Sequence, residues 1–255
     1  MATFEAQVEG LTSLSIDGSS SPTQTELTQF LTDGAKEILT ALPMDKKLMY
    51  STSNALDNST TYLTLGGSEV LGVMRDDGTI NQPCRRIPSS MSGRAQDSAE
   101  MIYGTTSDPV WWIVNNILSI FPEPSSAGAT VQTLAYPAVA YGDSAITKFP
   151  DEAEYLVPIY ASVKTLQNKM ASMVDEIPGN SDQDGTFTNS SSSSQGYEKV
   201  RNLLESQEDT ELASGTISAL SSEMQQFMAE YKWYQEQQAK LQADYDKGLQ
   251  IVMAG

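Results

Sequence analysis

The residues best suited to chemistry in this sequence form the run Cys84-Arg85-Arg86. Nearby cations lower the pKa of a thiol and so favour the nucleophilic thiolate. The chain contains one cysteine and no histidine, so no imidazole is present to serve as its base. We therefore interpret this run as a structural turn in which Arg85 and Arg86 pair with acidic neighbours, within the chain or across a subunit interface.

The absence of histidine excludes further classes of site, because histidine is the commonest general acid–base and transition-metal ligand. One cysteine excludes an internal disulfide framework and any cysteine-based metal cluster. The run Asp182-Gln-Asp-Gly185 is only a fragment of a calcium-binding loop, and Gly66-Gly67 lacks the Lys-Ser/Thr of a phosphate loop. The sequence predicts no catalytic, cofactor or metal site. Catalysis by carboxylate pairs or by a lysine remains open, and an enzyme that uses carboxylates alone is the enzymatic alternative.

Two aromatic clusters are the remaining candidates for binding. Trp111-Trp112 offers a surface for stacking a base or a sugar, but adjacent strand residues point to opposite faces. We expect one tryptophan in the core and the other at an interface or rim. The aromatic residues Tyr231, Trp233 and Tyr234 are predicted to pack along a helix. The interface candidates are Arg85, Arg86, Trp111, Trp112, Tyr231, Trp233 and Tyr234.

The charge balance limits the partners of the chain. It has 15 basic and 33 acidic residues, a formal net charge of −18. Such a surface repels nucleic-acid phosphates and favours solubility, and it suits a wall past which a polyanion slides without sticking. The start, MATFEAQVEG, lacks a secretory pattern, and no apolar run has the length of a membrane span. We expect a soluble, unexported chain.

The helices and strands expected along the sequence, which would position these residues, indicate an α+β, mainly α fold. Residues 1–22 are expected to form an extended N-terminal arm. Residues 23–174 are expected to form a helical bundle, whose first helix begins at the Thr23/Glu26 capping box and ends before Pro43. A small antiparallel β meander is inserted at about 48–136. Its expected strands are 61–65, 69–74, 79–80, 110–114, 117–121 and 130–136, with turns at Asp77-Gly78 and Asn115-Asn116 and a short helix over 95–103.

A second bundle helix is predicted over 152–174. It contains Pro158, which we expect to bend it around the first helix. Its apolar stripe, expected to be core, is Leu156, Ile159, Tyr160, Val163, Leu166, Met170 and Met173. The Ser-rich stretch 175–196 is expected to be a flexible loop.

The clearest periodicity lies in the C-terminal segment 197–255, predicted to be a long helix. Apolar positions there alternate in spacings of three and four over about five heptads. They are Ile217, Leu220, Met224, Phe227, Tyr231, Tyr234, Gln238, Leu241, Tyr245, Gly248 and Val252. We call this set the seam. It is imperfect at Gln238 and Gly248, which favours lateral packing of the helix on a partner.

Three stretches give the chain a family resemblance. They are Asn115 to Pro124 (NNILSIFPEP), Leu134 to Pro137 (LAYP) and Phe149 to Ser162 (FPDEAEYLVPIYAS). Together with the start at Met1 and the stretch from Thr25 to Ile38, which look like the first part of such chains, they resemble head-to-tail connector (adaptor or neck) proteins of tailed bacteriophages. The resemblance covers about residues 1–173.

The resemblance implies a non-enzymatic virion protein, assembled in the host cytoplasm as a homo-oligomeric ring of about twelve copies. Such a ring joins the portal to tail or other neck proteins, and DNA passes through its channel without specific binding during ejection. No cofactor and no membrane are implied. The alternative is a tail-tube, baseplate or fibre-attachment protein that uses the C-terminal heptads as a coiled coil.

Overall fold

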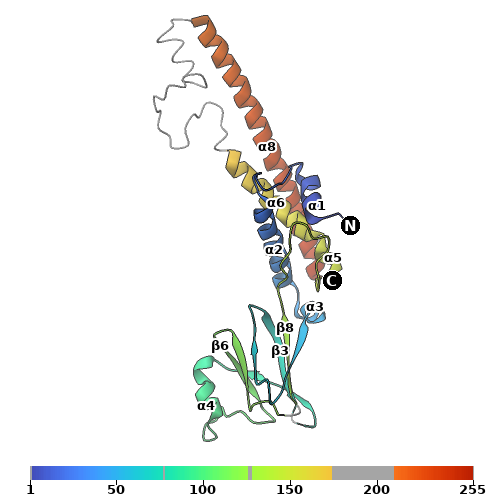
Figure 1. Cartoon of the computed structure of the whole chain (residues 1–255), viewed down its shortest axis with the longest axis vertical. Helices are drawn as coiled ribbons and strands as arrows, with labels where there is room; N and C mark the ends of the chain where they lie inside the picture. The colour runs from blue at the N-terminus through green and yellow to red at the C-terminus, as the bar shows by residue number, and fades with distance from the viewer. Residues whose placement is uncertain (1, 77, 126–127, 174–209, 255) are drawn as a thin grey trace. The chain divides into compact units, whose positions relative to one another are not determined.

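The computed structural model describes residues 2–76, 78–125, 128–173 and 210–254, and it is a mixed α+β structure with a long C-terminal helix (Figure 1). The chain divides into two compact units. One, the helical unit, contains residues 1–34, 139–145 and 155–251. The other, the strand unit, contains residues 35–138, 146–154 and 252–255. The predicted loop at 175–196, the turn residue Asp77 and the start of the predicted C-terminal segment lie outside the described residues.

The helical unit begins with a helix where an extended arm was expected. Helix α1 spans Phe4–Thr12, and the Thr3 side chain caps it by accepting the Ala6 backbone N–H. Phe4, Val8 and Thr12 are buried at helical i, i+4 spacing, and α1 packs against α6. The prediction of an extended arm is therefore wrong for these residues, because the apolar stripe and the cap were sufficient to fix a helix.

Helix α2 (Gln24–Ala41) has the capping box expected at its start. The Glu26 carboxylate accepts the Thr23 backbone N–H at 2.7 Å, and the Glu26 N–H donates back to the Thr23 hydroxyl at 3.3 Å. These hydrogen bonds from Thr23 to the charged form lower the pKa of Glu26. A Cβ at Gly34 would lie 2.8 Å from Cδ1 of Tyr160, so glycine allows α2 to approach α6 closely.

The proline of the second bundle helix has a different role from the one predicted. Helix α5 (Asp151–Glu154) ends before Tyr155, and α6 (Leu156–Ser172) begins after it. Pro158 thus lies in the first turn of α6, where a backbone N–H has no intrahelical acceptor. The single bent helix is wrong, and a break at Tyr155 replaces it. The burial predicted for Leu156, Val163, Leu166, Met170 and Met173 is confirmed.

The strand unit contains two four-stranded sheets. The first has the order β1-β8-β3-β4: β1 (Thr52–Leu56), β8 (Ala129–Leu134), β3 (Glu69–Asp76) and β4 (Asn81–Pro83). The second has the order β2-β7-β6-β5: β2 (Tyr62–Thr64), β7 (Ile117–Phe121), β6 (Val110–Val114) and β5 (Arg85–Arg86). The short helices α3 (Met44–Met49), α4 (Ser92–Gln96) and the 3-10 turn η1 (Ser89–Met91) also belong to this unit.

The sheet pairing is less local than a meander. The β6–β7 hairpin is confirmed, and its turn residues Asn115 and Asn116 have φ of 51° and 65°. Most other pairs join distant segments, including β1 with β8 and the parallel pair β5–β6. Residues 79–80, predicted as a strand, precede β4 instead, and the helix predicted over 95–103 ends at Gln96. There the Asp97 carboxylate accepts the Ala99 N–H and turns the chain.

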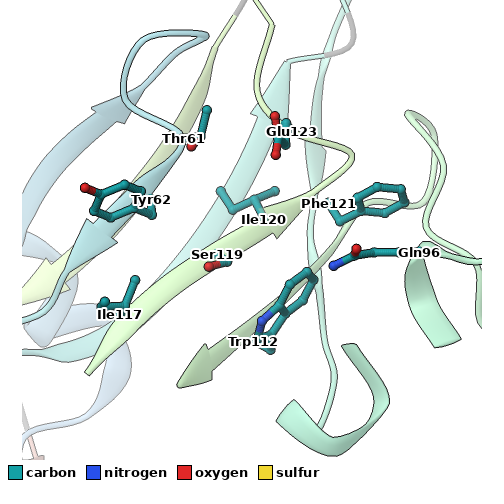
Figure 2. A pocket seen from close by; sticks show the side chains of 9 residues that line it. All are labelled: Thr61, Tyr62, Gln96, Trp112, Ile117, Ser119, Ile120, Phe121 and Glu123. Carbon is teal, nitrogen blue, oxygen red and sulfur yellow. The ribbon is translucent and has the colours of Figure 1, made fainter. Parts of the chain in front are cut away.

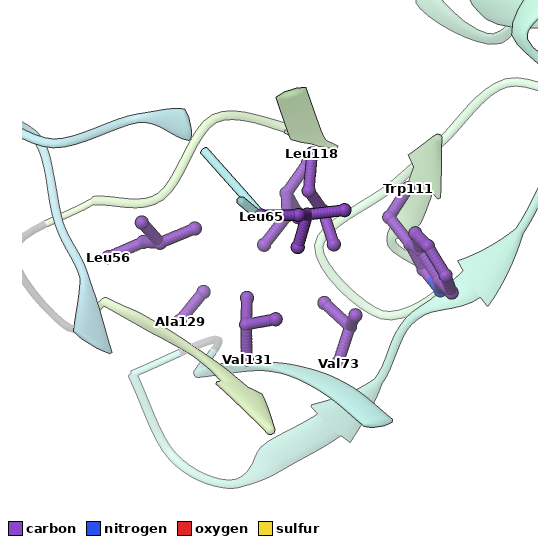
Figure 3. Close-up of a cluster of buried hydrophobic side chains, with 8 residues drawn as sticks. Leu56, Leu65, Val73, Trp111, Leu118, Ala129 and Val131 are labelled. Atoms are coloured by element: carbon purple, nitrogen blue, oxygen red, sulfur yellow. The ribbon is translucent and has the colours of Figure 1, made fainter. Parts of the chain in front are cut away.

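The two sheets pack face to face around one apolar cluster (Figure 3). Leu56, Val73 and Val131 come from the first sheet, and Trp111 and Leu118 come from the second. A second cluster lies on the opposite face of the second sheet, under η1 and α4. Strand β6 therefore contributes apolar side chains to both faces of the second sheet, which explains its nearly continuous apolar sequence. Among the described residues, no helix is both long and apolar enough to cross a membrane.

Candidate interaction surface

Helix α8 (Thr210–Ala254) carries the seam, and its C-terminal part packs within the helical unit. We call residues Tyr234–Gly248 the covered segment. Its seam positions Tyr234, Leu241, Tyr245 and Gly248 are buried, and Tyr234 and Leu241 join Val163, Leu166, Met170 and Met173 of the α6 region in one cluster. The prediction that the three-and-four spacing marks a packed face is confirmed for this segment.

At Gly248, where the seam has no side chain, α8 makes a close contact with the start of α6. A Cβ at this position would meet Cδ2 of Leu156 and would lie 2.8 Å from the Tyr155 hydroxyl. Nearby, the rings of Tyr245 and Tyr160 pack with their centroids 5.6 Å apart. Glycine therefore lets the start of α6 sit directly against α8.

The N-terminal part of α8 has the same seam without the same cover. We call residues Thr210–Trp233 the open segment, because none of the side chains described there is buried. Of its described seam positions, Ile217 and Tyr231 are 49% and 39% exposed, whereas Met224 and Phe227 are half-buried and Phe227 packs against the α6 cluster. Beside the seam, Leu212 and Met228 are 54% and 63% exposed. Figure 1 shows α8 continuing past the C-terminal end of α6. The exposed apolar residues of this segment make it a candidate surface for a protein partner.

The three aromatic candidates lie where the two segments meet. Tyr234 is buried, and its hydroxyl donates to the Glu230 carboxylate at 3.0 Å. Tyr231 and Trp233 are 39% and 45% exposed. Tyr234 thus packs as predicted, whereas Tyr231 and Trp233 remain on the surface of the chain.

The arginine candidates have partners inside the strand unit. Arg85 forms an ion pair with Asp108 at 2.9 Å, and the Arg86 guanidinium lies 5.3 Å from the centre of the Trp111 ring. Both arginines are exposed on β5. Their contact with another subunit stays a prediction.

Both tryptophans of β6 are buried, at 8% exposure each. Trp111 belongs to the cluster between the sheets, and Trp112 belongs to the cluster under α4. The expectation that one of them is left at an interface or rim is therefore not met in the chain, because each tryptophan joins an apolar cluster, on opposite faces of the second sheet.

Cys84 is unsuited to nucleophilic chemistry. Burial raises the pKa of its thiol to about 12, and the nearby Arg75 offsets this only in part. Arg75 is itself buried and donates to the backbone carbonyls of Pro122 and Glu123 at 3.0 and 3.2 Å. Sequence reasoning missed this anchoring role, because nothing local to Arg75 distinguishes it from a surface arginine.

The described residues contain one further hollow of interest, on the outer face of the second sheet. It has a volume of about 410 Å³, and its lining is mixed: Tyr62, Trp112 and Ser119, the polar residues Thr61, Gln96 and Glu123, and the apolar residues Ile117, Ile120 and Phe121. Within the described parts of the chain, no three acidic or cysteine side chains come together in a way that would hold a metal ion.

No protein-family model matches the chain, and no curated protein matches it significantly.

Proposed function

We propose that this protein is a non-enzymatic structural component of a virion: a ring-forming head-to-tail adaptor that joins the portal to the tail. The proposal starts from the sequence resemblance to phage connectors. The structural observation that carries it is the open segment of α8, a long helix whose seam continues beyond the body that covers it. A chain with such a surface is built to pack against another chain.

The composition of the open segment supports a protein partner. Its charged residues are three glutamates and one lysine, Glu211, Glu223, Glu230 and Lys232, in a chain of net charge −18. The remaining polar residues are mostly Ser, Thr and Gln, which are uncharged and can therefore pack against another helix at low electrostatic cost. The acidic remainder of the chain suits a channel through which DNA passes without specific binding.

The alternative is a tail-tube, baseplate or fibre-attachment protein, in which the open segment forms a coiled coil. The exposed seam supports this alternative as well, so the stoichiometry of the assembly distinguishes the two. In a ring, each copy presents its seam to a different surface of the next copy, whereas in a coiled coil the seams pair with one another.

The test is native mass spectrometry and negative-stain imaging of the purified full chain. A ring of about twelve copies supports the adaptor, and trimers or sixfold rings support the alternative. A stable monomer at all concentrations contradicts both.

A pair of variants tests whether the open segment makes the interface. Ile217→Glu with Met228→Glu places charge at one exposed seam position and at an exposed residue about three turns further along the same side of the helix. It is expected to abolish assembly while leaving the monomer folded. The control is Met101→Glu, at a fully exposed apolar residue of the strand unit. Assembly that survives in the double variant would show that the open segment is not the interface.

The arginine candidates are tested separately. Arg85→Glu with Arg86→Glu is expected to impair assembly and to leave the monomer folded, since both side chains are exposed on β5. An unchanged oligomer would remove both residues from the interface.

A further inference from the structure

We propose that the hollow on the outer face of the second sheet binds a saccharide. The inference does not depend on the proposed role of the protein in a virion. It rests on the strand register, the unused polar groups and the charge of the lining.

The register places two aromatic side chains on either side of a small one. Tyr62 of β2 pairs with Ser119 of β7, and Ser119 pairs with Trp112 of β6, so the three share one face of the sheet. Neighbouring strands are about 4.8 Å apart, which sets the two aromatic residues about 10 Å apart with the serine as a floor. Figure 2 shows Ser119 between Tyr62 and Trp112. The volume of about 410 Å³ lies within the range of about 300–1,000 Å³ typical of small-ligand pockets.

The polar side chains of the lining have no partner among the described residues. The side chains of Thr61, Gln96, Ser119 and Glu123, and the indole N–H of Trp112, make no hydrogen bond or ion pair within the part of the chain that the structure describes. Gln96 reaches the hollow from α4 and Glu123 from the loop after β7 (Figure 2). A ligand here meets both donors and acceptors, with the Glu123 carboxylate accepting only.

These groups discriminate between ligand classes. A purely apolar ligand would cover the polar groups without pairing them, which costs binding free energy. A nucleotide would bring phosphate to a lining that holds Glu123 and no lysine or arginine, in a chain of net charge −18. A neutral ligand with many hydroxyls fits both requirements. Its hydroxyls hydrogen-bond to Glu123, Gln96, Ser119 and Thr61, and the C–H face of a ring packs on the exposed Tyr62, with the mostly buried Trp112 also in the lining.

The experiment titrates the full chain with maltotriose, cellotriose and triacetylchitotriose, followed by intrinsic tryptophan fluorescence and by calorimetry. AMP is the charged counter-probe. We expect saturable binding of at least one trisaccharide with a dissociation constant of about 1 mM or tighter, and no binding of AMP.

Two tyrosine variants locate the site. Tyr62 is 57% exposed, so Tyr62→Ala is expected to leave the fold intact and to weaken binding about tenfold or more. The matched control is Tyr141→Ala, at a tyrosine 37% exposed in the helical unit, which should bind as the parent does. Ser119→Leu fills the floor of the hollow and should also abolish binding. Absence of a saturable signal with all three sugars, tighter binding of AMP, or equal binding by the parent and Tyr62→Ala would overturn the proposal.

Discussion

The open and covered segments of α8 belong to one helix and carry one seam, yet the covered segment is buried against α6, whereas the described part of the open segment is mostly exposed, with Phe227 packed on the α6 cluster. From Tyr234 to Gly248 the seam faces the α6 cluster, whereas from Thr210 to Trp233 none of the described side chains is buried. Both segments have apolar residues in the same alternation of three and four. Periodicity therefore identifies the face of a helix that must be buried and leaves open which chain buries it.

The largest expected difference between the segments is in amide hydrogen exchange. Amides of the covered segment should open only with the helical unit, at a free energy that approaches global unfolding, about 5–15 kcal/mol. Amides of the open segment should exchange far faster in the monomer, because Phe227 is the one described side chain there that joins the α6 cluster, and a helix with so few tertiary contacts is marginal in water. Hydrogen–deuterium exchange with mass spectrometry measures both. Equal protection of the two segments in the dilute monomer would contradict the distinction between them. Protection of the open segment that appears only on assembly would support its role as the interface.

A pair of truncations should differ by several kcal/mol in unfolding free energy. Leu241→Ala removes a side chain that is 4% exposed and is expected to cost about 2–5 kcal/mol through lost burial and a cavity. Ile217→Ala, at a residue 49% exposed, should change the stability of the monomer by no more than about 0.5 kcal/mol. Urea denaturation of the two variants provides the measurement. A large loss of stability for Ile217→Ala would mean that the open segment is packed in the monomer.

Replacing each of two glycines of α8 by alanine should change the stability of the protein in opposite directions. A Cβ at Gly248 meets Leu156 and the Tyr155 hydroxyl, so we expect overpacking to outweigh the gain in helix propensity, for a net loss of about 1–2 kcal/mol. A Cβ at Gly215 meets no atom within 4 Å, so Gly215→Ala should stabilise the helix by about 0.5–1 kcal/mol. Thermal unfolding by circular dichroism measures both shifts. Stabilisation by Gly248→Ala would show that α6 and α8 can separate at low cost.

The seam shows which features of the fold can be predicted from local sequence patterns. The sequence predicts the long C-terminal helix, its packed face, the Thr23/Glu26 cap and the Asn115-Asn116 turn, because each depends on residues within one or two helical turns or one hairpin. The same reasoning should have found α1, where the Thr3 cap precedes Phe4 and Val8 at helical spacing. It also placed Pro158 in the interior of one bent helix. The break after Glu154 instead puts the proline in the first turn of α6, where its missing N–H leaves no hydrogen bond unmade.

The sheets and the hollow depend on contacts that no local pattern encodes. The pairing of β1 with β8 joins Thr52 to Thr133, and the parallel pair β5–β6 sets Arg85 beside Val110. The row of Tyr62, Ser119 and Trp112 exists only after three strands align in register. Trp112 was recognised as an aromatic candidate, but nothing in the sequence indicated which residues would share its face.

The smallest expected effect concerns the ion pair that bridges the two segments. Lys232 and Glu236 lie one turn apart at 3.8 Å, with side chains 74% and 70% exposed. An exposed pair at this spacing contributes about 0.3–0.5 kcal/mol, and lysine preceding glutamate is the less favourable order. A double-mutant cycle of Lys232→Ala and Glu236→Ala should give a coupling of this size at low salt, and none at about 1 M salt, where the Debye length falls to about 3 Å. A salt-resistant coupling above about 1 kcal/mol would place the pair in a less solvated site. Side chains at the junction would then be shielded from water in the monomer, and the distinction between the two segments would fail at the point where they join.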